Sequence, residues 1–275
     1  MKINIISFFL GLLVISGCHE NKKKKQETTS WKFSKEIPLE NVSPIGIVSQ
    51  NNFLWLSDVD NNRVVKADLD GNILEAFDGF QRPMHMAIKE DKIYVPEYTS
   101  DSLKIIENGN VSTLELKENT DGIGGVSVFG NTVAIADFYN HRIILQQEDK
   151  VIILGKEGHD DGELYYPTDV EMSDDLIYVA DAYNNRVQVF DFEGNYVRMI
   201  GWNESIKVAT GLKVTDSQVI VADFEGNRVL IYDLNGKLLQ IVSGKFNQPT
   251  DIEIVNGTMY VVNYKGKAIS ILEKR

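Results

Sequence analysis

The sequence has little of the chemistry from which many catalytic and metal centres are built. It holds one cysteine and four histidines among 275 residues. A single cysteine cannot form an internal disulfide, so the stability of the fold must come from packing. No serine-centred nucleophile elbow and no glycine-rich phosphate loop occurs. The common signatures of serine hydrolases and nucleotide-binding enzymes are therefore excluded.

The N-terminus lacks an apolar run long enough to span a bilayer, which needs about 20 residues. The run from Ile5 to Ile15 fits instead the hydrophobic part of a secretory signal peptide. It ends in Ile15-Ser16-Gly17-Cys18, which resembles the lipobox of bacterial lipoproteins. That resemblance implies that residues 1–17 are removed, that Cys18 is lipidated, and that the chain is anchored to a bacterial cell-envelope membrane. A free cysteine in an ordinary signal peptide is the alternative.

Positive charge is scarce beyond the N-terminal region. Residues 18–29 are polar, contain the lysine run Lys22–Lys25, and are expected to form a flexible tether. Residues 30–275 hold 23 basic and 38 acidic groups, a net charge of −15. Such a surface repels phosphate backbones, so we expect no nucleic-acid partner. The expected partners are the membrane, through the anchor, and a protein, glycan or peptide ligand.

What the sequence does contain is an internal repeat. Six apolar runs end in a polar residue at steps of 39, 40, 44, 42 and 40 residues. These end residues are Asp58, Glu97, Asp137, Asp181, Asp223 and Asn263. Twelve residues before each lies a second column, which consists of Gly46, His85, Gly125, Asp169, Gly211 and Asp251.

Each repeat is typical of four short strands joined by turns. The run that ends at the polar residue is almost continuously apolar, which indicates burial on both faces and sheets stacked face to face. Units of this length with four strands predict a β-propeller, here all-β with six blades across residues 30–275. The last unit supplies only three strands. We therefore expect the segment around Trp31 and Phe33 to complete it and close the ring.

The repeats resemble NHL repeats, in which Pro-x-Gly/Asp precedes a strand that ends in Val-Ala-Asp, followed by Asn-x-Arg-Val. The unit with "YPTDV", "IYVAD" and "YNNRV" matches best, whereas the second and sixth units match poorly. Four units carry an Asp and, five residues later, an Arg. We interpret these pairs as structural joints rather than ligand sites; they are Asp58 and Arg63, Asp137 and Arg142, Asp181 and Arg186, and Asp223 and Arg228.

Propellers usually bind ligands where the innermost strands converge. His85, Asp169 and Asp251 come from alternate blades in that region and could form a metal site with open positions, for calcium or zinc. The simpler interpretation is that the aspartates cap backbone amides and that no cofactor is bound. Exposed aromatic residues in the blade loops could contact a peptide or glycan, or could pack on neighbouring blades; they are Tyr98, Phe138, Tyr139, Tyr183 and Phe224.

The site residues of two enzyme families with this architecture can be compared with the sequence. The peptide-amidating lyase binds zinc through histidines, two of which directly follow the proline of a blade. The matching residues here include no histidine; they are Ile45, Met84, Gly124, Thr168, Thr210 and Thr250. We therefore expect that zinc site, and that activity, to be missing. The gluconolactonase-like hydrolases have signatures too dispersed to recognise.

Two functions remain open from the sequence. The first is a non-catalytic binding or scaffold module at the cell envelope, with no catalytic residue to name. The second is a metal-dependent hydrolase or lyase, of the gluconolactonase-like kind, with its site at the mouth of the central channel. Fold alone does not separate the two, because propellers host both.

Overall fold

The computed structural model describes residues 30–173 and 175–275. The predicted signal peptide, the lipidation site Cys18 and the tether lie outside these residues. Within the described ranges, no helix combines the length and apolar character needed to cross a membrane.

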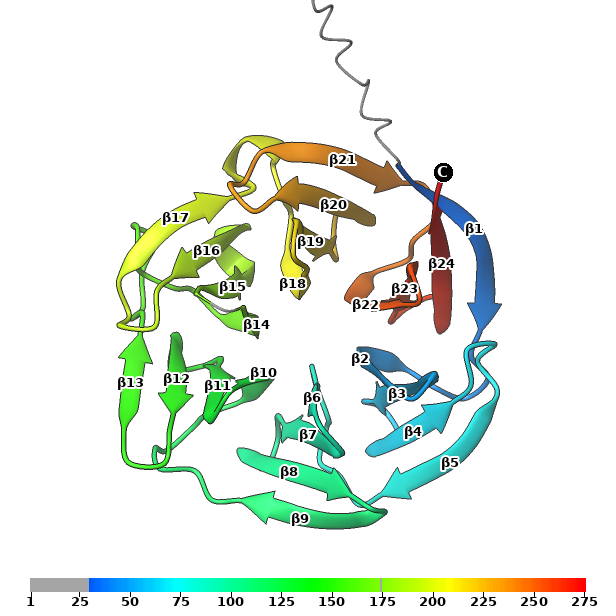
Figure 1. Cartoon of the computed structure of the whole chain (residues 1–275), viewed down its shortest axis with the longest axis horizontal. Coiled ribbons are helices and arrows are strands. Elements are labelled where there is room, and N and C mark those ends of the chain that lie inside the picture. Colours follow the sequence, from blue (N-terminus) through cyan, green and yellow to red (C-terminus); the bar gives the residue numbers. More distant parts are fainter. Residues whose placement is uncertain (1–29, 174) are drawn as a thin grey trace, which may run out of the picture.

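Six antiparallel sheets of four strands are arranged as a ring (Figure 1). Each sheet is one blade, and its strands run from the axis outward. Blades one to three consist of β2 (Pro44–Gln50), β3 (Phe53–Asp58), β4 (Arg63–Ala67) and β5 (Ile73–Asp78); β6 (Ala87–Lys89), β7 (Lys92–Glu97), β8 (Ser102–Glu107) and β9 (Asn110–Leu114); and β10 (Ile123–Phe129), β11 (Thr132–Asp137), β12 (Arg142–Gln146) and β13 (Val151–Leu154).

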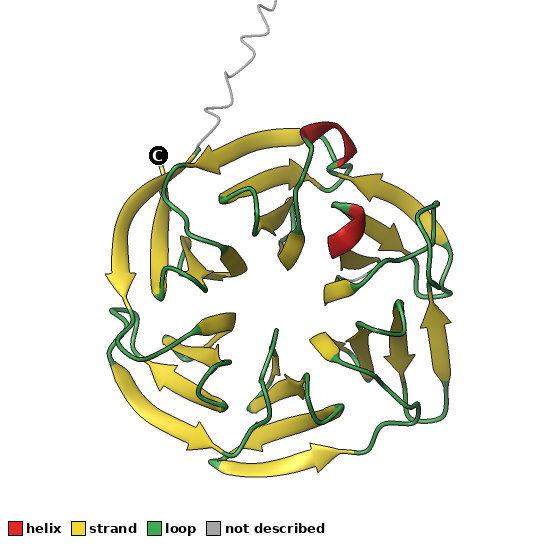
Figure 2. Cartoon of the chain, turned by 180° about the vertical axis from the view of Figure 1, so that it is seen from behind, coloured by secondary structure: helices red, strands yellow, loops and turns green. Residues whose placement is uncertain are grey.

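The remaining blades follow the same plan, with two short 3₁₀ helices in the loops (red in Figure 2). They consist of β14 (Pro167–Met172), β15 (Ile177–Asp181), η1 (Ala182–Asn184), β16 (Arg186–Phe190) and β17 (Tyr196–Ile200); η2 (Trp202–Glu204), β18 (Ala209–Val214), β19 (Gln218–Asp223), β20 (Arg228–Asp233) and β21 (Leu238–Ser243); and β22 (Pro249–Val255), β23 (Thr258–Asn263), β24 (Ala268–Lys274) and β1 (Trp31–Pro38).

The ring is closed by β1, which is the outer strand of the last blade (Figure 1). Trp31 pairs with Lys274 and Ile37 with Ile269 in an antiparallel register. The predicted six-bladed fold and its closure by the N-terminal strand are thus confirmed. Closure pairs the free edge of β24, which would otherwise expose unpaired backbone groups.

The hydrophobic core lies between the blades rather than within a single centre. Each of the six clusters of buried side chains combines residues of two neighbouring blades. The second strand of a blade contributes to the cluster on each side, and all five residues of β15 are buried. This explains why these strands read as continuous apolar runs.

The innermost strands begin with an irregularity that aims side chains at the axis. In β14 the pairing with β15 shifts register between Pro167 and Asp169, and β22 repeats the shift between Pro249 and Asp251. The inner strand of blade two is shorter, and His85 precedes it in an isolated bridge to Gly125. Blade two therefore departs from the structural repeat at His85, where the sequence also has a residue other than glycine or aspartate.

Candidate functional site

Equivalent positions of the six inner strands form a ring around the axis, which we call the channel ring. Its members are Gly46, His85, Gly125, Asp169, Gly211 and Asp251. A Cβ atom on Gly211 would lie 2.1 Å from the carbonyl oxygen of Thr250, and one on Gly46 would lie 2.5 Å from that of Met84. Because no side chain fits at the glycines, only the even-numbered blades contribute a side chain to the channel ring.

The two aspartates of the ring join neighbouring blades. Oδ1 of Asp251 accepts the amide of Ile252 at 2.8 Å, and Oδ2 accepts the amide of Ile47 in blade one at 2.9 Å. Asp169 repeats this arrangement between blades four and five, with both distances 2.9 Å. Capping of backbone amides, the simpler interpretation from the sequence, therefore accounts for part of their role.

His85 stands in the third equivalent position, but here the backbone joins the blades. Its N–H donates to Gly124 O and its carbonyl accepts the amide of Val126, both at 3.1 Å. The Nδ1 atom of the imidazole lies 3.5 Å from Oδ2 of Asp251, without the orientation of a hydrogen bond. Among the described residues this buried nitrogen has no hydrogen-bond partner. One ligand atom each from His85, Asp169 and Asp251 lie within 4.8 Å of one another.

The electrostatics of the ring favour retention of positive charge. Burial alone would lower the pKa of His85, but the charges of Asp169 and Asp251 outweigh it and hold the pKa above its usual value. Burial, opposed by His85 and reinforced by Asp251, raises the pKa of Asp169 to about 7. The ring thus binds protons more readily than isolated side chains would.

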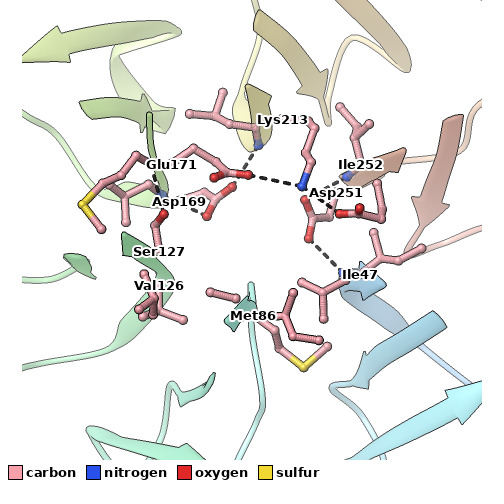
Figure 3. Close-up of a pocket in the computed structure, with 17 residues that line it drawn as sticks. Ile47, Met86, Val126, Ser127, Asp169, Glu171, Lys213, Asp251 and Ile252 are labelled. Atoms are coloured by element: carbon pink, nitrogen blue, oxygen red, sulfur yellow. Dashed lines mark hydrogen bonds and ion pairs between the residues drawn. The ribbon is translucent and has the colours of Figure 1, made fainter. Parts of the chain in front are cut away.

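A second charged layer lies two residues further along the same inner strands (Figure 3). Nζ of Lys213 is 2.8 Å from Glu253 and 3.6 Å from Glu171. These residues and the two ring aspartates line a cavity of about 130 Å³. No motif in the sequence marks this layer. The alternation of strand side chains was the available signal, since residues two apart in a strand share a face.

Burial also shifts the pKa values in this second layer. It raises the pKa of Glu171 to about 7, against the attraction of Lys213 and with repulsion from Asp169, Glu253 and Asp251. Burial opposes the charge of Lys213, but Glu253 and Glu171 outweigh it and raise the lysine pKa. Lys213 therefore remains protonated, and among the described residues that line the cavity it is the only lysine or arginine.

Aromatic residues gather at the end of the channel where the inner strands begin. Five of them line a cavity of about 340 Å³, which we call the aromatic mouth: Tyr98, Phe138, Tyr139, Tyr166 and Tyr183. Phe138 lies 4.9 Å from Tyr166 between ring centroids, and the hydroxyl of Tyr98 donates to that of Tyr139 at 2.7 Å. Tyr139 and Tyr183 stay 48% and 58% exposed, so these rings do not simply pack between blades.

Four of the five aromatic candidates from the sequence thus lie in the mouth. The fifth, Phe224, lines an adjoining cavity of about 290 Å³, together with Arg82 and the inner-strand residues Thr168 and Thr210. Sequence reasoning missed Tyr166, which directly precedes the first strand of its blade. Its backbone amide donates to Nδ1 of His141, and its φ of 54° aims the ring across the mouth.

The Asp and Arg pairs lie at the turns between second and third strands. Arg63, Arg142, Arg186 and Arg228 each place Nε 2.7–2.8 Å from the carboxylate of their Asp. All four aspartates are fully buried. Glu97 and Asn263 take this place in blades two and six, where each accepts a backbone amide from the segment that enters its blade. The geometry is that of a joint which ties each turn to the incoming chain.

The positions that hold zinc histidines in the amidating lyase carry threonines in three blades. Thr168, Thr210 and Thr250 each donate to a carbonyl oxygen of the next blade, at 2.9–3.4 Å. These hydroxyls therefore join blades, and the expectation from the sequence that a zinc site of that kind is missing stays a prediction.

The fold is similar to that of known β-propellers. A sequence-family model described as a 6-bladed beta-propeller matches residues 149–248. No curated protein matches the sequence. Among solved structures, a structural-genomics protein of unknown function from Bacteroides thetaiotaomicron is similar over 90% of this chain and 76% of its own, with 15% identity and a TM-score of 0.71.

Two further structures are similar at this level. Virginiamycin B lyase from Staphylococcus aureus has 15% identity and a TM-score of 0.66, and the alignment covers 89% of this chain and 99% of the lyase. The WD40 β-propeller domain of Doa1 has 13% identity and a TM-score of 0.67, with 89% and 97% covered. One is an enzyme and the other a WD40 domain. The family description agrees with the six blades of the structure, and the fold of this chain is a six-bladed β-propeller.

Proposed function

We propose that this chain is a lipid-anchored propeller of the NHL type that binds a protein, peptide or glycan at the bacterial cell envelope through its aromatic mouth. The observation that carries the proposal is the set of five aromatic side chains around one cavity, two of them about half exposed. Exposed aromatic rings with hydroxyl groups offer large contact area and a polar end, which is why tyrosines are enriched at binding sites.

The rigidity of the surrounding ring supports this function. The mouth residues lie in loops that follow the second strands or precede the first strands of blades two to four, and both ends of these loops are held by buried joints. Binding residues on loops that a rigid scaffold positions lose little entropy when a ligand binds. The lipobox at Ile15–Cys18 supports attachment to an envelope membrane, and two or more acyl chains would make it durable.

A photocrosslinker tests this proposal. Benzoylphenylalanine in place of Tyr183, in the full-length protein in its native envelope, is expected to give a defined adduct. The matched control is the same group in place of Phe129, an exposed aromatic at the far end of β10 from the mouth. The Tyr139→Ala change should weaken the adduct, and Cys18→Ser should move the protein out of the membrane fraction. Equal adducts from positions 183 and 129 would contradict binding at the mouth.

The second candidate function is a hydrolase or lyase that acts in the channel. The observation that favours it is the buried cluster of an imidazole and two carboxylates on the axis, next to the second layer of Glu171, Lys213 and Glu253. Clusters of carboxylates with raised pKa values are frequent at catalytic sites. The similarity to virginiamycin B lyase supports only the fold, because identity is 15%.

A further inference from the structure

Among the described residues, Nδ1 of the His85 imidazole makes no hydrogen bond, although it lies 3.5 Å from Oδ2 of Asp251. In blades four and six the side chain of the ring residue joins the next blade, whereas in blade two the backbone of His85 does so. The side chain is nevertheless only 3% exposed, and its Nδ1 lacks a partner among the described residues. A buried nitrogen without a partner costs stability, so such a group calls for an explanation.

The cavity beside His85 also carries an excess of negative charge. Asp169, Glu171, Asp251 and Glu253 line it, and Lys213 is the only lysine or arginine among the described residues on its wall. Lys213 already binds Glu253 at 2.8 Å and lies 3.6 Å from Glu171. The two ring aspartates are 4% and 5% exposed and, among the described residues, accept hydrogen bonds only from backbone amides; Nδ1 of His85 lies 3.5 Å from Oδ2 of Asp251. Buried carboxylates at this spacing require a counter-charge.

We propose that His85, Asp169 and Asp251 bind one divalent transition-metal ion on the axis of the propeller. One imidazole nitrogen and two carboxylate oxygens form the donor set that suits manganese, iron, cobalt or zinc. Calcium prefers six to eight oxygen ligands, which this ring does not supply. The three donor atoms lie within 4.8 Å of one another, and the centre of a triangle of that size is about 2.8 Å from each corner. Each donor atom would therefore move inward by about 0.7 Å to come within about 2.1 Å of an ion.

The surroundings of these three side chains fit a metal ion that keeps open coordination positions. The adjoining cavity of about 130 Å³ can hold several water molecules, since one occupies about 30 Å³ in the liquid. The backbone amides that bind Asp169 and Asp251 fix the orientation of both carboxylates, as outer partners do in known metal centres. This site is independent of the aromatic mouth, and either could exist without the other.

The competing explanation is a protonated His85 that neutralises the two aspartates by itself. Both explanations place positive charge in the ring, but only a metal site binds Co²⁺ with a spectrum that depends on the imidazole. The experiment therefore uses full-length protein, purified in detergent, treated with EDTA and titrated with Co²⁺. Visible absorption of the bound ion reports its ligands, and inductively coupled plasma mass spectrometry reports the number of ions per chain.

We expect saturation at one Co²⁺ per chain and a higher midpoint of thermal unfolding in the loaded protein. His85→Ala should weaken binding by more than the 10–100-fold typical of the loss of an outer partner, because it removes a direct ligand. The backbone contacts of residue 85 remain in this variant, so it should fold. His159→Ala is the matched control, since it removes an exposed histidine that bonds Asn184 in a loop, and it should leave binding unchanged.

Two results would overturn the proposal. One is the absence of bound Co²⁺ at stoichiometric concentration in the folded, EDTA-treated protein. The other is equal binding by the wild type and by His85→Ala, which would place the ion on surface carboxylates. In the first case, nitrogen-15 spectra that show both ring nitrogens of His85 protonated at neutral pH would establish the competing explanation.

Discussion

The joints and the channel ring surround their buried carboxylates with different sets of hydrogen-bond donors. At a joint such as that of blade four, Asp181 accepts hydrogen bonds from a backbone amide, an arginine, an asparagine and a glutamine. In the part of the ring that the structure describes, Asp169 and Asp251 each accept hydrogen bonds from two backbone amides, and Oδ2 of Asp251 lies 3.5 Å from Nδ1 of His85 without a hydrogen bond. The joints are therefore electrostatically complete, and the ring is not.

This difference separates architecture from chemistry in a repeat protein. The Asp and Arg joint recurs in four blades with almost the same distances, as expected where every blade must meet the same mechanical need. The ring and the aromatic mouth differ from blade to blade. Departures from the repeat, such as His85 and Lys213, therefore indicate function more strongly than the residues that recur.

Removal of a joint should cause the largest loss of stability. Asp181→Ala would leave Arg186, which is only 2% exposed, buried without its partner. Loss of one member of a buried pair typically costs about 3–5 kcal/mol. Urea unfolding followed by circular dichroism measures this cost. A loss below about 1 kcal/mol would mean that Asn184 and Gln188 replace the carboxylate, and the contrast with the ring would disappear.

The joints were also the part of the molecule that the sequence revealed best. Their spacing repeats along the chain, so one blade supports the interpretation of the others, and the number of blades and the closing strand followed from the same repeat. The column of Gly46 to Asp251 was visible for this reason too. The contacts of this column could not be predicted, because the amide of Ile47 donates to Oδ2 of Asp251, a residue 204 positions away in the chain.

The second layer and part of the mouth were missed for a related reason. Glu171, Lys213 and Glu253 occupy one position in three blades, but the same position holds Val48, Ala87 and Ser127 in the others. No repeated motif marks them. The sequence does not single out Tyr166, because a residue that precedes a proline carries no repeated motif of its own. Only the curvature of the ring brings its side chain beside Phe138.

A side chain added at a glycine of the channel ring should cause the next largest loss of stability. Gly211→Ala places a Cβ atom 2.1 Å from the carbonyl oxygen of Thr250, and that oxygen belongs to backbone that cannot turn away. Overpacking of this kind costs about 1–3 kcal/mol. Gly266→Ala is the control, because its closest neighbour would be 3.1 Å away. Thermal unfolding should show a lower midpoint for Gly211→Ala than for the control, and equal midpoints would mean that the ring can widen.

The smallest expected change in stability is a gain rather than a loss, and it distinguishes the channel from the joints. Burial raises the pKa of Glu171 from 4.5 to about 7, so in EDTA-treated protein the charged form is disfavoured by folding. This penalty is absent below about pH 4.5 and is fully present above about pH 7, so stability from this group falls as pH rises. Glu171→Gln should therefore raise stability at pH 8 by on the order of 1–2 kcal/mol and leave it unchanged at pH 4.

The groups that face Glu171 decide whether this gain is realised. Asp169, Asp251 and Glu253 repel its charge, while Lys213 attracts it and keeps its bond of 2.8 Å to Glu253 in the variant. Urea unfolding at the two pH values measures the difference. A loss of stability at pH 8 would mean that Lys213 depends on both glutamates and that this layer is a joint like the others. A gain would show that the channel retains a charge the fold does not need, which is what a binding site requires and a joint does not.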